Sequence, residues 1–137
     1  QDTIAYRPPA VCAGATNIFA IVGPNLIKLI GGYYTALPGG ATTLTVAVNG
    51  VNTVAAAVDI GTGGAIGEVW VSTLNVAGAM LGALGGLPLT DALLHSKGFL
   101  TGDSVGLIVA TFAVANWTGS IFCVYQKLAP NSSIVPV

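Results

Sequence analysis

Residues 43–50, which read Thr43-Leu44-Thr45-Val46-Ala47-Val48-Asn49-Gly50, decide the fold class of this chain. Larger apolar residues alternate with threonine or alanine, so the larger apolar side chains point to one face of an extended strand. Asn49-Gly50 then supplies the two positive φ angles that a type I′ turn requires. With residues 51–58 as the returning arm, this pattern predicts a β-hairpin whose outer face carries threonine instead of charged residues.

The rest of the chain divides into similar short strands, which glycine and proline separate. Gly23-Pro24, residues 37–40 and residues 61–64 are typical of turns. Residues 116–119, Asn-Trp-Thr-Gly, predict a second short hairpin loop that joins the last two strands. Gly31-Gly32 predicts a bulge, because glycine weakens the interior of a strand. We therefore expect further strands at 16–22, 26–36, 66–74, 104–114 and 119–127.

Residues 90–98 do not fit the strand pattern and predict a short helix. Thr90 can cap its N-terminus, Asp91 and Lys97 match the helix dipole, and Gly98 can end it. The sequence as a whole predicts an all-β fold. It favours a two-sheet antiparallel jelly-roll-like sandwich of about eight short strands with one short helical insertion. An up-and-down barrel stays open as a second topology.

The composition indicates that neighbours cover much of the surface. Charged residues make up 7% and hydrophobic residues 53% of the 137 residues, whereas a typical soluble domain carries about 25% charged residues. A single domain of this size cannot bury that much apolar surface by itself. Large exposed apolar surfaces mark contacts with other proteins or with lipid. The composition therefore favours a subunit of an assembly.

Two charge-free stretches, 69–90 and 104–126, have the length of a membrane-spanning helix. Both contain glycine, threonine and asparagine, and lysine and arginine do not gather beside one set of ends, as they do in membrane proteins. We therefore predict no membrane segment, and a membrane-embedded protein stays a minor alternative. The sparse positive charge also argues against nucleic-acid binding, which requires clustered lysine and arginine.

The sequence offers few residues for chemistry, so we predict no catalytic residue, no cofactor and no metal ion. His95 is the single histidine, and its neighbour in sequence, Ser96, cannot share its helical face. A cation site built from Asp59 and Asp103 with loop carbonyls stays a minor alternative. The glycines of residues 61–67 lack the spacing of a nucleotide-binding loop. The chain is therefore not expected to be an enzyme.

The two cysteines, Cys12 and Cys123, are expected to be free and buried, because an unpaired cysteine behaves as a small hydrophobe. A disulfide between an N-terminal arm and the last strand is the alternative interpretation.

The two ends of the chain lack alternation and contain proline, which predicts extended arms at 1–13 and 128–137 around a single domain at 14–127. Tyrosine and arginine are enriched among interface anchors, so we expect the arms to contact a partner, with frayed ends as the alternative. Removing residues 1–9 is expected to leave the fold intact and to weaken that contact. The expected partner-contact residues are Tyr6, Arg7, Pro8, Pro9, Ile134, Val135 and Pro136.

The chain resembles the small virion proteins of tailed bacteriophages that are rich in glycine, alanine and threonine, some of which are capsid cement or decoration proteins. The resemblance spans most of the chain outside residues 76–97. It is carried by residues 17–23, 27–31, 43–45, 59–60, 118–121, Tyr125 and 128–130.

The resemblance implies a jelly-roll cement protein that binds the outside of an icosahedral phage head and clamps neighbouring major capsid subunits. It implies two partners, the major capsid protein and a second copy of the chain in a dimer or trimer. The protein would be made in the host cytoplasm and would end on the capsid exterior. The alternatives are a self-assembling coat or tail-tube subunit, a membrane-embedded protein, and a small monomeric binding module.

Overall fold

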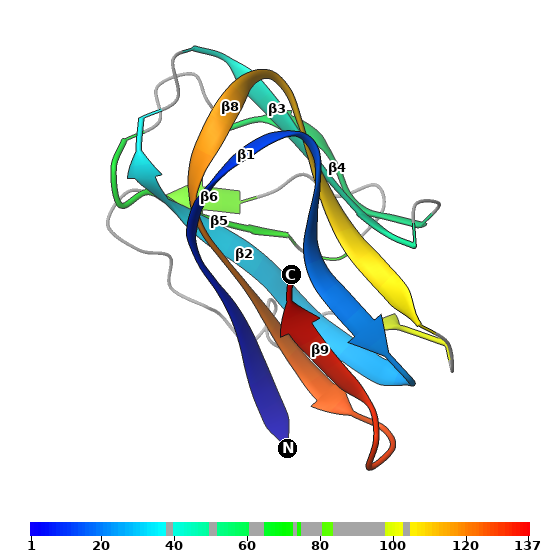
Figure 1. The fold of residues 1–137 in the computed structure, drawn as a ribbon. Coiled ribbons are helices and arrows are strands. Elements are labelled where there is room, and N and C mark those ends of the chain that lie inside the picture. The colour runs from blue at the N-terminus through cyan, green and yellow to red at the C-terminus, as the bar shows by residue number, and fades with distance from the viewer. Residues whose placement is uncertain are drawn as a thin grey trace.

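The computed structural model describes residues 1–37, 40–49, 52–60, 65–72, 74, 81–83, 98–102 and 105–137. All regular elements in these ranges are β-strands, and they form one antiparallel sheet (Figure 1). The predicted all-β class is confirmed. The strands are β1 (Asp2–Val22), β2 (Asn25–Ala36), β3 (Thr42–Val48), β4 (Asn52–Asp59), β5 (Val69–Ser72), β6 (Leu81–Ala83), β7 (Phe99–Leu100), β8 (Gly106–Lys127) and β9 (Ser133–Pro136).

Two long strands, β1 and β8, form the spine of the sheet. They pair antiparallel from Asp2 opposite Gln126 to Ile21 opposite Gly106. The other edge of β8 is shared, because β3 pairs with its first half and β2 with its second half. The remaining strands extend these two parts, giving the order β4-β3-β8-β2-β5-β6, with β9 on β1 and β7 on β2.

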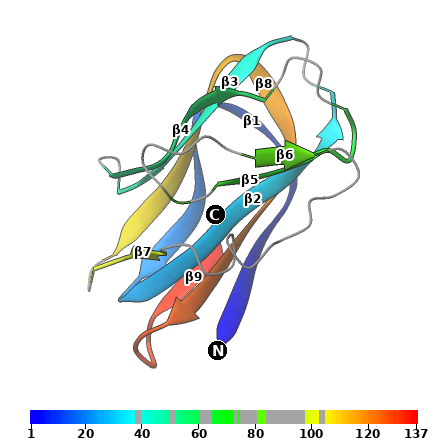
Figure 2. The ribbon, with the colours of Figure 1, turned by 180° about the vertical axis from the view of Figure 1, so that it is seen from behind.

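The spine bends sharply near its middle. Cys12 pairs with Trp117 but Gly14 pairs with Phe112, so β8 contributes several extra residues at this point. Gly14 and Val114 both have positive φ angles there, 57° and 88°. In Figure 1 the two strands arch over together, and Figure 2 shows β2, β5 and β6 on the opposite side of the molecule. The bend folds the sheet around its own core.

Trp117 lies at the centre of that core. Its ring is fully buried and lies close to the rings of Tyr34, Trp70 and Phe112, with centroid separations of 5.9, 6.1 and 5.3 Å. Large side chains from both halves of the sheet belong to the same core cluster. The fully buried ones besides Trp117 include Ile18, Phe19, Ile21, Ile27, Ile30, Leu44, Ile108, Ile121 and Ile134.

The hairpin predicted at residues 43–58 is confirmed. β3 pairs antiparallel with β4, and Leu44, Val46 and Val48 are buried while the residues between them are partly exposed. Val48 pairs with Asn52, so three residues separate the paired ends instead of the two of the predicted type I′ turn. Asn49 begins this connection with a φ angle of 56°. Gly50 lies outside the described residues.

The hairpin loop predicted at residues 116–119 is wrong, because β8 runs without a break through this segment. Thr118 pairs with Val11 on one side and with Ala36 on the other, so two neighbouring strands hold it extended. Gly119 is explained by close packing instead of a turn. A Cβ atom there would run into the carbonyl oxygen of Tyr33 and the ring of Trp117.

The two ends of the chain differ from the predicted arms. Residues 2–13 belong to β1 and pair with β8, and β9 pairs with residues 19–22 of β1. Both segments are therefore strands of the sheet. The alternation was hidden because β1 contains register shifts, one of which spans Pro8 and Pro9.

Several expectations fall outside the described residues, namely the helix at 90–98 except for Gly98, the turn at 61–64, and the side chains of His95 and Asp103. No helix in the described part of the chain is long and apolar enough to cross a membrane.

The two cysteines are free and buried, as expected. Cys12 pairs with Trp117 and Cys123 with Ala5. The two thiols are thus about six residues, or roughly 20 Å, apart along the ladder, well beyond the reach of a disulfide. Burial raises the pKa of Cys123 to about 12.

Candidate interaction surface

Three hydroxyl groups meet on the outer face of the sheet, where β1, β8 and β2 lie side by side. The hydroxyl of Tyr6 lies 2.8 Å from that of Tyr33 and 3.0 Å from Oγ of Ser120. Tyr33 and Ser120 are direct cross-strand neighbours, and Tyr6 reaches them from the edge strand. Hydrogen bonds from Ser120 and then Tyr6 lower the pKa of Tyr33 below its ordinary value. The cluster fixes the Tyr6 ring on the surface.

Apolar side chains border this cluster along β1. Ile4 is 66% exposed and Val11 is 62% exposed, and both lie on the edge strand with Tyr6. Beyond the bend, Val114 of β8 is 90% exposed. Covering such side chains with another surface lowers the free energy, because apolar area is removed from water. We call Ile4, Tyr6, Val11 and Val114 the apolar strip.

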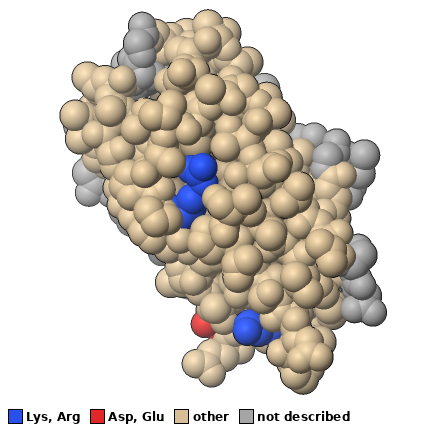
Figure 3. Space-filling view, in the orientation of Figure 1, with Lys and Arg blue, Asp and Glu red and all other residues tan. Residues whose placement is uncertain are grey.

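The described surface carries very little charge. In Figure 3, lysine and arginine atoms reach the visible face in two places and an acidic group in one, while the remaining described atoms are uncharged. Nζ of Lys28 lies 2.7 Å from a carboxylate oxygen of Asp2, so this cation is already paired. Exposed pairs of this kind contribute little stability.

Arg7 lies on the opposite face of β1 from Tyr6, on the same face as buried Ala5. Its Nη1 donates to Sγ of Cys12 at 3.4 Å, and its Nε is buried with no hydrogen-bond partner. Burial raises the pKa of the Cys12 thiol, and the nearby guanidinium only partly offsets that rise. The raised pKa favours the protonated thiol of Cys12, and no acidic side chain of the described residues pairs with Arg7.

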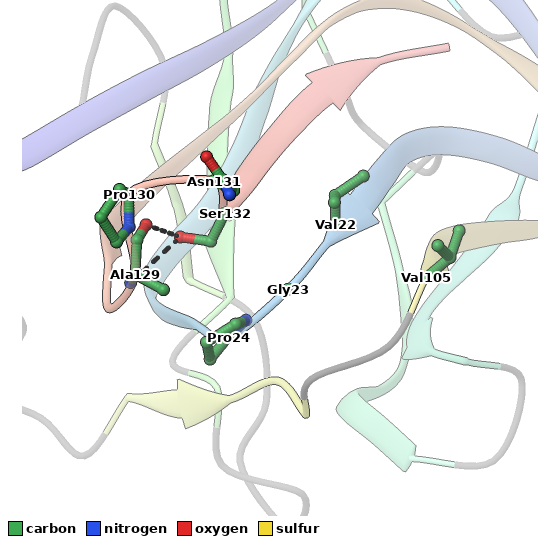
Figure 4. A pocket seen from close by; sticks show the side chains of 8 residues that line it. All are labelled: Val22, Gly23, Pro24, Val105, Ala129, Pro130, Asn131 and Ser132. Atoms are coloured by element: carbon green, nitrogen blue, oxygen red, sulfur yellow. Dashed lines mark hydrogen bonds between the residues drawn. The ribbon is translucent and has the colours of Figure 1, made fainter.

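A shallow groove of about 290 Å³ lies at one end of the sheet (Figure 4). Its lining comes from the turn between β1 and β2, from Val105, and from the turn between β8 and β9. Within the latter, Oγ of Ser132 donates to the carbonyl oxygen of Ala129 at 2.8 Å. Val22, Pro24 and Pro130 make most of its wall apolar, so the groove offers contact area but no reactive group.

The structure separates the two sets of expected contact residues. Tyr6 and Arg7 pair with the second half of β8, on opposite faces of β1. At the other end of β1, Val135 pairs with Ala20 and is exposed, whereas Ile134 is buried in the core. The remaining expected residues, Pro8, Pro9 and Pro136, are exposed.

The described residues hold no group of three or more histidine, cysteine, aspartate or glutamate side chains that could bind a metal ion. Asp59, one of the two residues of the alternative cation site, accepts a hydrogen bond from the backbone N–H of Thr42 at 3.3 Å.

Sequence reasoning selected Tyr6 but missed Tyr33 and Ser120. These residues lie 27 and 114 positions from Tyr6 in the sequence. Only the pairing of β1, β8 and β2 brings them together, so no local pattern could have indicated the cluster.

Comparisons of the chain with family models, with curated proteins and with solved structures found no match.

Proposed function

We propose that this chain is a structural virion protein, a cement or decoration protein that binds the outer surface of an icosahedral phage head. In this role it clamps neighbouring major capsid subunits and associates with itself as a dimer or trimer. No chemical reaction is involved. The proposal rests on the sequence resemblance and on the character of the described surface.

The observation that carries the proposal is an almost uncharged surface with large apolar side chains left outside. Ile4, Val11 and Val114 are each more than half exposed. A freely dissolved protein with a formal net charge of −1 would have little repulsion to keep such surfaces apart. Covering them with capsid subunits buries no unpaired charge.

The fold suits a clamp. The bent spine of β1 and β8 gathers both halves of the sheet around the Trp117 core, and we interpret this arrangement as a jelly-roll-like sandwich. A rigid sheet loses little conformational entropy when it docks. Modest contacts of one copy with two capsid subunits would add up through avidity, as would the contacts of symmetric copies.

The edge of β1 favours docking over unlimited self-pairing. Within the described residues, β1 pairs on its second side only through residues 19–22. Pro8 and Pro9 lie in the open part, and each lacks the N–H group that an added strand would need. This edge therefore does not template long sheets of identical copies, as a self-assembling subunit with strand-to-strand contacts would require.

Sedimentation of the purified chain with and without empty phage heads tests the proposal. We expect the chain to pellet with the heads and to stay in the supernatant alone. A chain that pellets alone as shells or tubes would be a coat or tail-tube subunit. A chain that never pellets with heads would contradict the cement function.

A further inference from the structure

We propose that Arg7 is the anchor for a carboxylate group of the protein to which this chain binds. This inference rests on the proposed function and names the chemistry of the contact. It starts from the unusual state of the Arg7 side chain, which is partly buried without an anion beside it.

The guanidinium of Arg7 has N–H donors that make no hydrogen bond to the described residues. Among the described residues its hydrogen-bond acceptor is the thiol of Cys12, 3.4 Å from Nη1, and a thiol is a weak acceptor. Nε is buried and has no acceptor at all. Within the described part of the chain, no hydrogen bond involves Nη2. Nε and Nη2 form one edge of the guanidinium, and that edge matches the two oxygens of a carboxylate.

Leaving this edge unpaired is costly in a protein, because a buried donor without an acceptor loses its hydrogen bond to water. A carboxylate that approaches Nη2 would reach Nε after a small rotation of the guanidinium. The weak thiol contact offers little resistance to that rotation. The site is thus ready for an incoming anion.

The surroundings favour a carboxylate over a phosphate chain. Nucleic acids need clustered cations, whereas Lys28, the next cation along the chain, is already paired with Asp2. Exposed Pro8 and Pro9 follow Arg7 along β1 and give the site an apolar border. An arginine within an apolar border is typical of protein interfaces.

The described acidic side chains of a second copy are poorly suited to fill the site. In the described residues, Asp2 pairs with Lys28, and Asp59 accepts from the backbone of Thr42. Glu68 accepts a hydrogen bond from the backbone N–H of Ala65. These three carboxylates are thus already engaged. The proposed function supplies a different protein, the capsid subunit, and we assign the carboxylate to an aspartate or glutamate of that subunit.

The first experiment uses acetate as the probe and needs no partner. In protein labelled with ¹⁵N-arginine, the Nε–H signal of Arg7 is followed during titration with sodium acetate, with sodium chloride at equal ionic strength as control. We expect a saturable shift with acetate alone. Identical responses to acetate and chloride would overturn the carboxylate site, whatever the chain binds.

The second experiment measures binding to empty phage heads by sedimentation for Arg7→Gln, Arg7→Lys and the control Lys28→Gln. We expect both Arg7 variants to bind at least roughly tenfold more weakly than wild type. Arg7→Gln loses a partly buried charge pair, and Arg7→Lys keeps the charge but loses the bidentate geometry. Lys28→Gln should bind within about twofold of wild type, because exposed pairs contribute little. Circular dichroism and thermal unfolding establish that each variant is folded. If Arg7→Gln is unstable, Arg7→Lys, which keeps the positive charge, is the variant that tests the anchor.

The outcomes separate this inference from the proposed function. If wild type and both Arg7 variants bind the heads equally well, the anchor is overturned and the cement function stays intact. If the wild-type chain does not bind the heads, the capsid subunit is overturned as the partner, and the acetate titration still decides whether the carboxylate site exists. A change of oligomeric state in Arg7→Gln alone would assign the carboxylate to a second copy and contradict our assignment.

Discussion

The indole of Trp117 stacks on the ring of Phe112, with centroids 5.3 Å apart and planes 7° apart. These residues bracket the bend of the spine, since Phe112 is opposite Gly14 and Trp117 is opposite Cys12. Between them, β8 leaves the β1 ladder, and Val114 instead pairs with Thr42 of β3. The stack therefore closes the bend from the inside.

Replacing Trp117 should destabilise the whole fold. Trp117→Ala removes a fully buried ring and should lower the free energy of unfolding by about 3–5 kcal/mol. Trp117→Phe should cost less, because it keeps an aromatic ring next to Phe112. Urea-induced unfolding measures both, and a loss below about 1 kcal/mol for the alanine variant would contradict the central role of the stack.

Val114→Gly should stabilise the protein. Val114 is 90% exposed and has a φ angle of 88°, which is unfavourable for a β-branched residue. Glycine relieves that strain, worth roughly 1–2 kcal/mol, and loses little packing. The control is Val11→Gly, an exposed strand position without a positive φ angle, which should destabilise by about 0.5–1 kcal/mol. Equal effects of the two substitutions on the midpoint of urea unfolding would show that the bend is unstrained.

Gly119→Ala should destabilise, because the added methyl group would meet backbone as well as the ring of Trp117. The oxygen of Tyr33 belongs to a paired strand and cannot move freely. We expect a loss of more than about 2 kcal/mol, typical of overpacking against rigid groups. Gly40→Ala, which meets nothing within 4 Å, is the matched control and should leave the thermal midpoint unchanged. Similar midpoints for both variants would count against the close approach at Gly119.

Alkaline pH should weaken the fold through Tyr34. Burial, followed by the charges of Glu68 and Asp59, raises the pKa of Tyr34 to about 12, above its ordinary value of 10.0. The folded state then holds the proton more tightly than the unfolded state, so stability is retained below pH 10 and falls as the pH rises toward 12. Tyr34→Phe should reduce this fall, measured by urea unfolding at several pH values. The part due to Cys123, whose pKa is also raised by burial, should persist. An identical pH dependence in Tyr34→Phe and wild type would contradict the assignment.

Removing residues 1–9 should impair folding, contrary to what the sequence suggests. The deletion takes away buried Ala5, the hydroxyl contacts of Tyr6 and the ladder between this part of β1 and β8. We expect a large drop of the thermal midpoint or insoluble protein. Removal of Gln1 alone, which lies outside β1, should change nothing. A soluble truncated protein with the wild-type midpoint would show that this half of β1 is dispensable.

Local patterns predicted the elements whose partners are close in sequence. The β3–β4 hairpin was predictable because its alternation and its Asn49-Gly50 turn signal lie within one short segment, although the connection is one residue longer than that signal predicts. The path of β8 was not, because the turn signal at residues 116–119 is overridden by pairing with β1 and β2, far away in sequence. The same holds for the strand character of residues 2–13.

The candidate surface was predictable only in part. Composition indicated an uncharged exterior, and residue type singled out Tyr6 and Arg7. Their opposite placement on β1, and the partners Ser120 and Cys12, depend on register, which the sequence does not specify across its register shifts.

Electron cryomicroscopy of empty phage heads incubated with the purified chain shows whether and where the chain binds the shell. We expect added density on the outer surface, at junctions between capsid subunits, with the apolar strip covered and Arg7 beside an acidic side chain of the shell. Bare heads in the presence of saturating chain, or regular shells formed by the chain without heads, would contradict it.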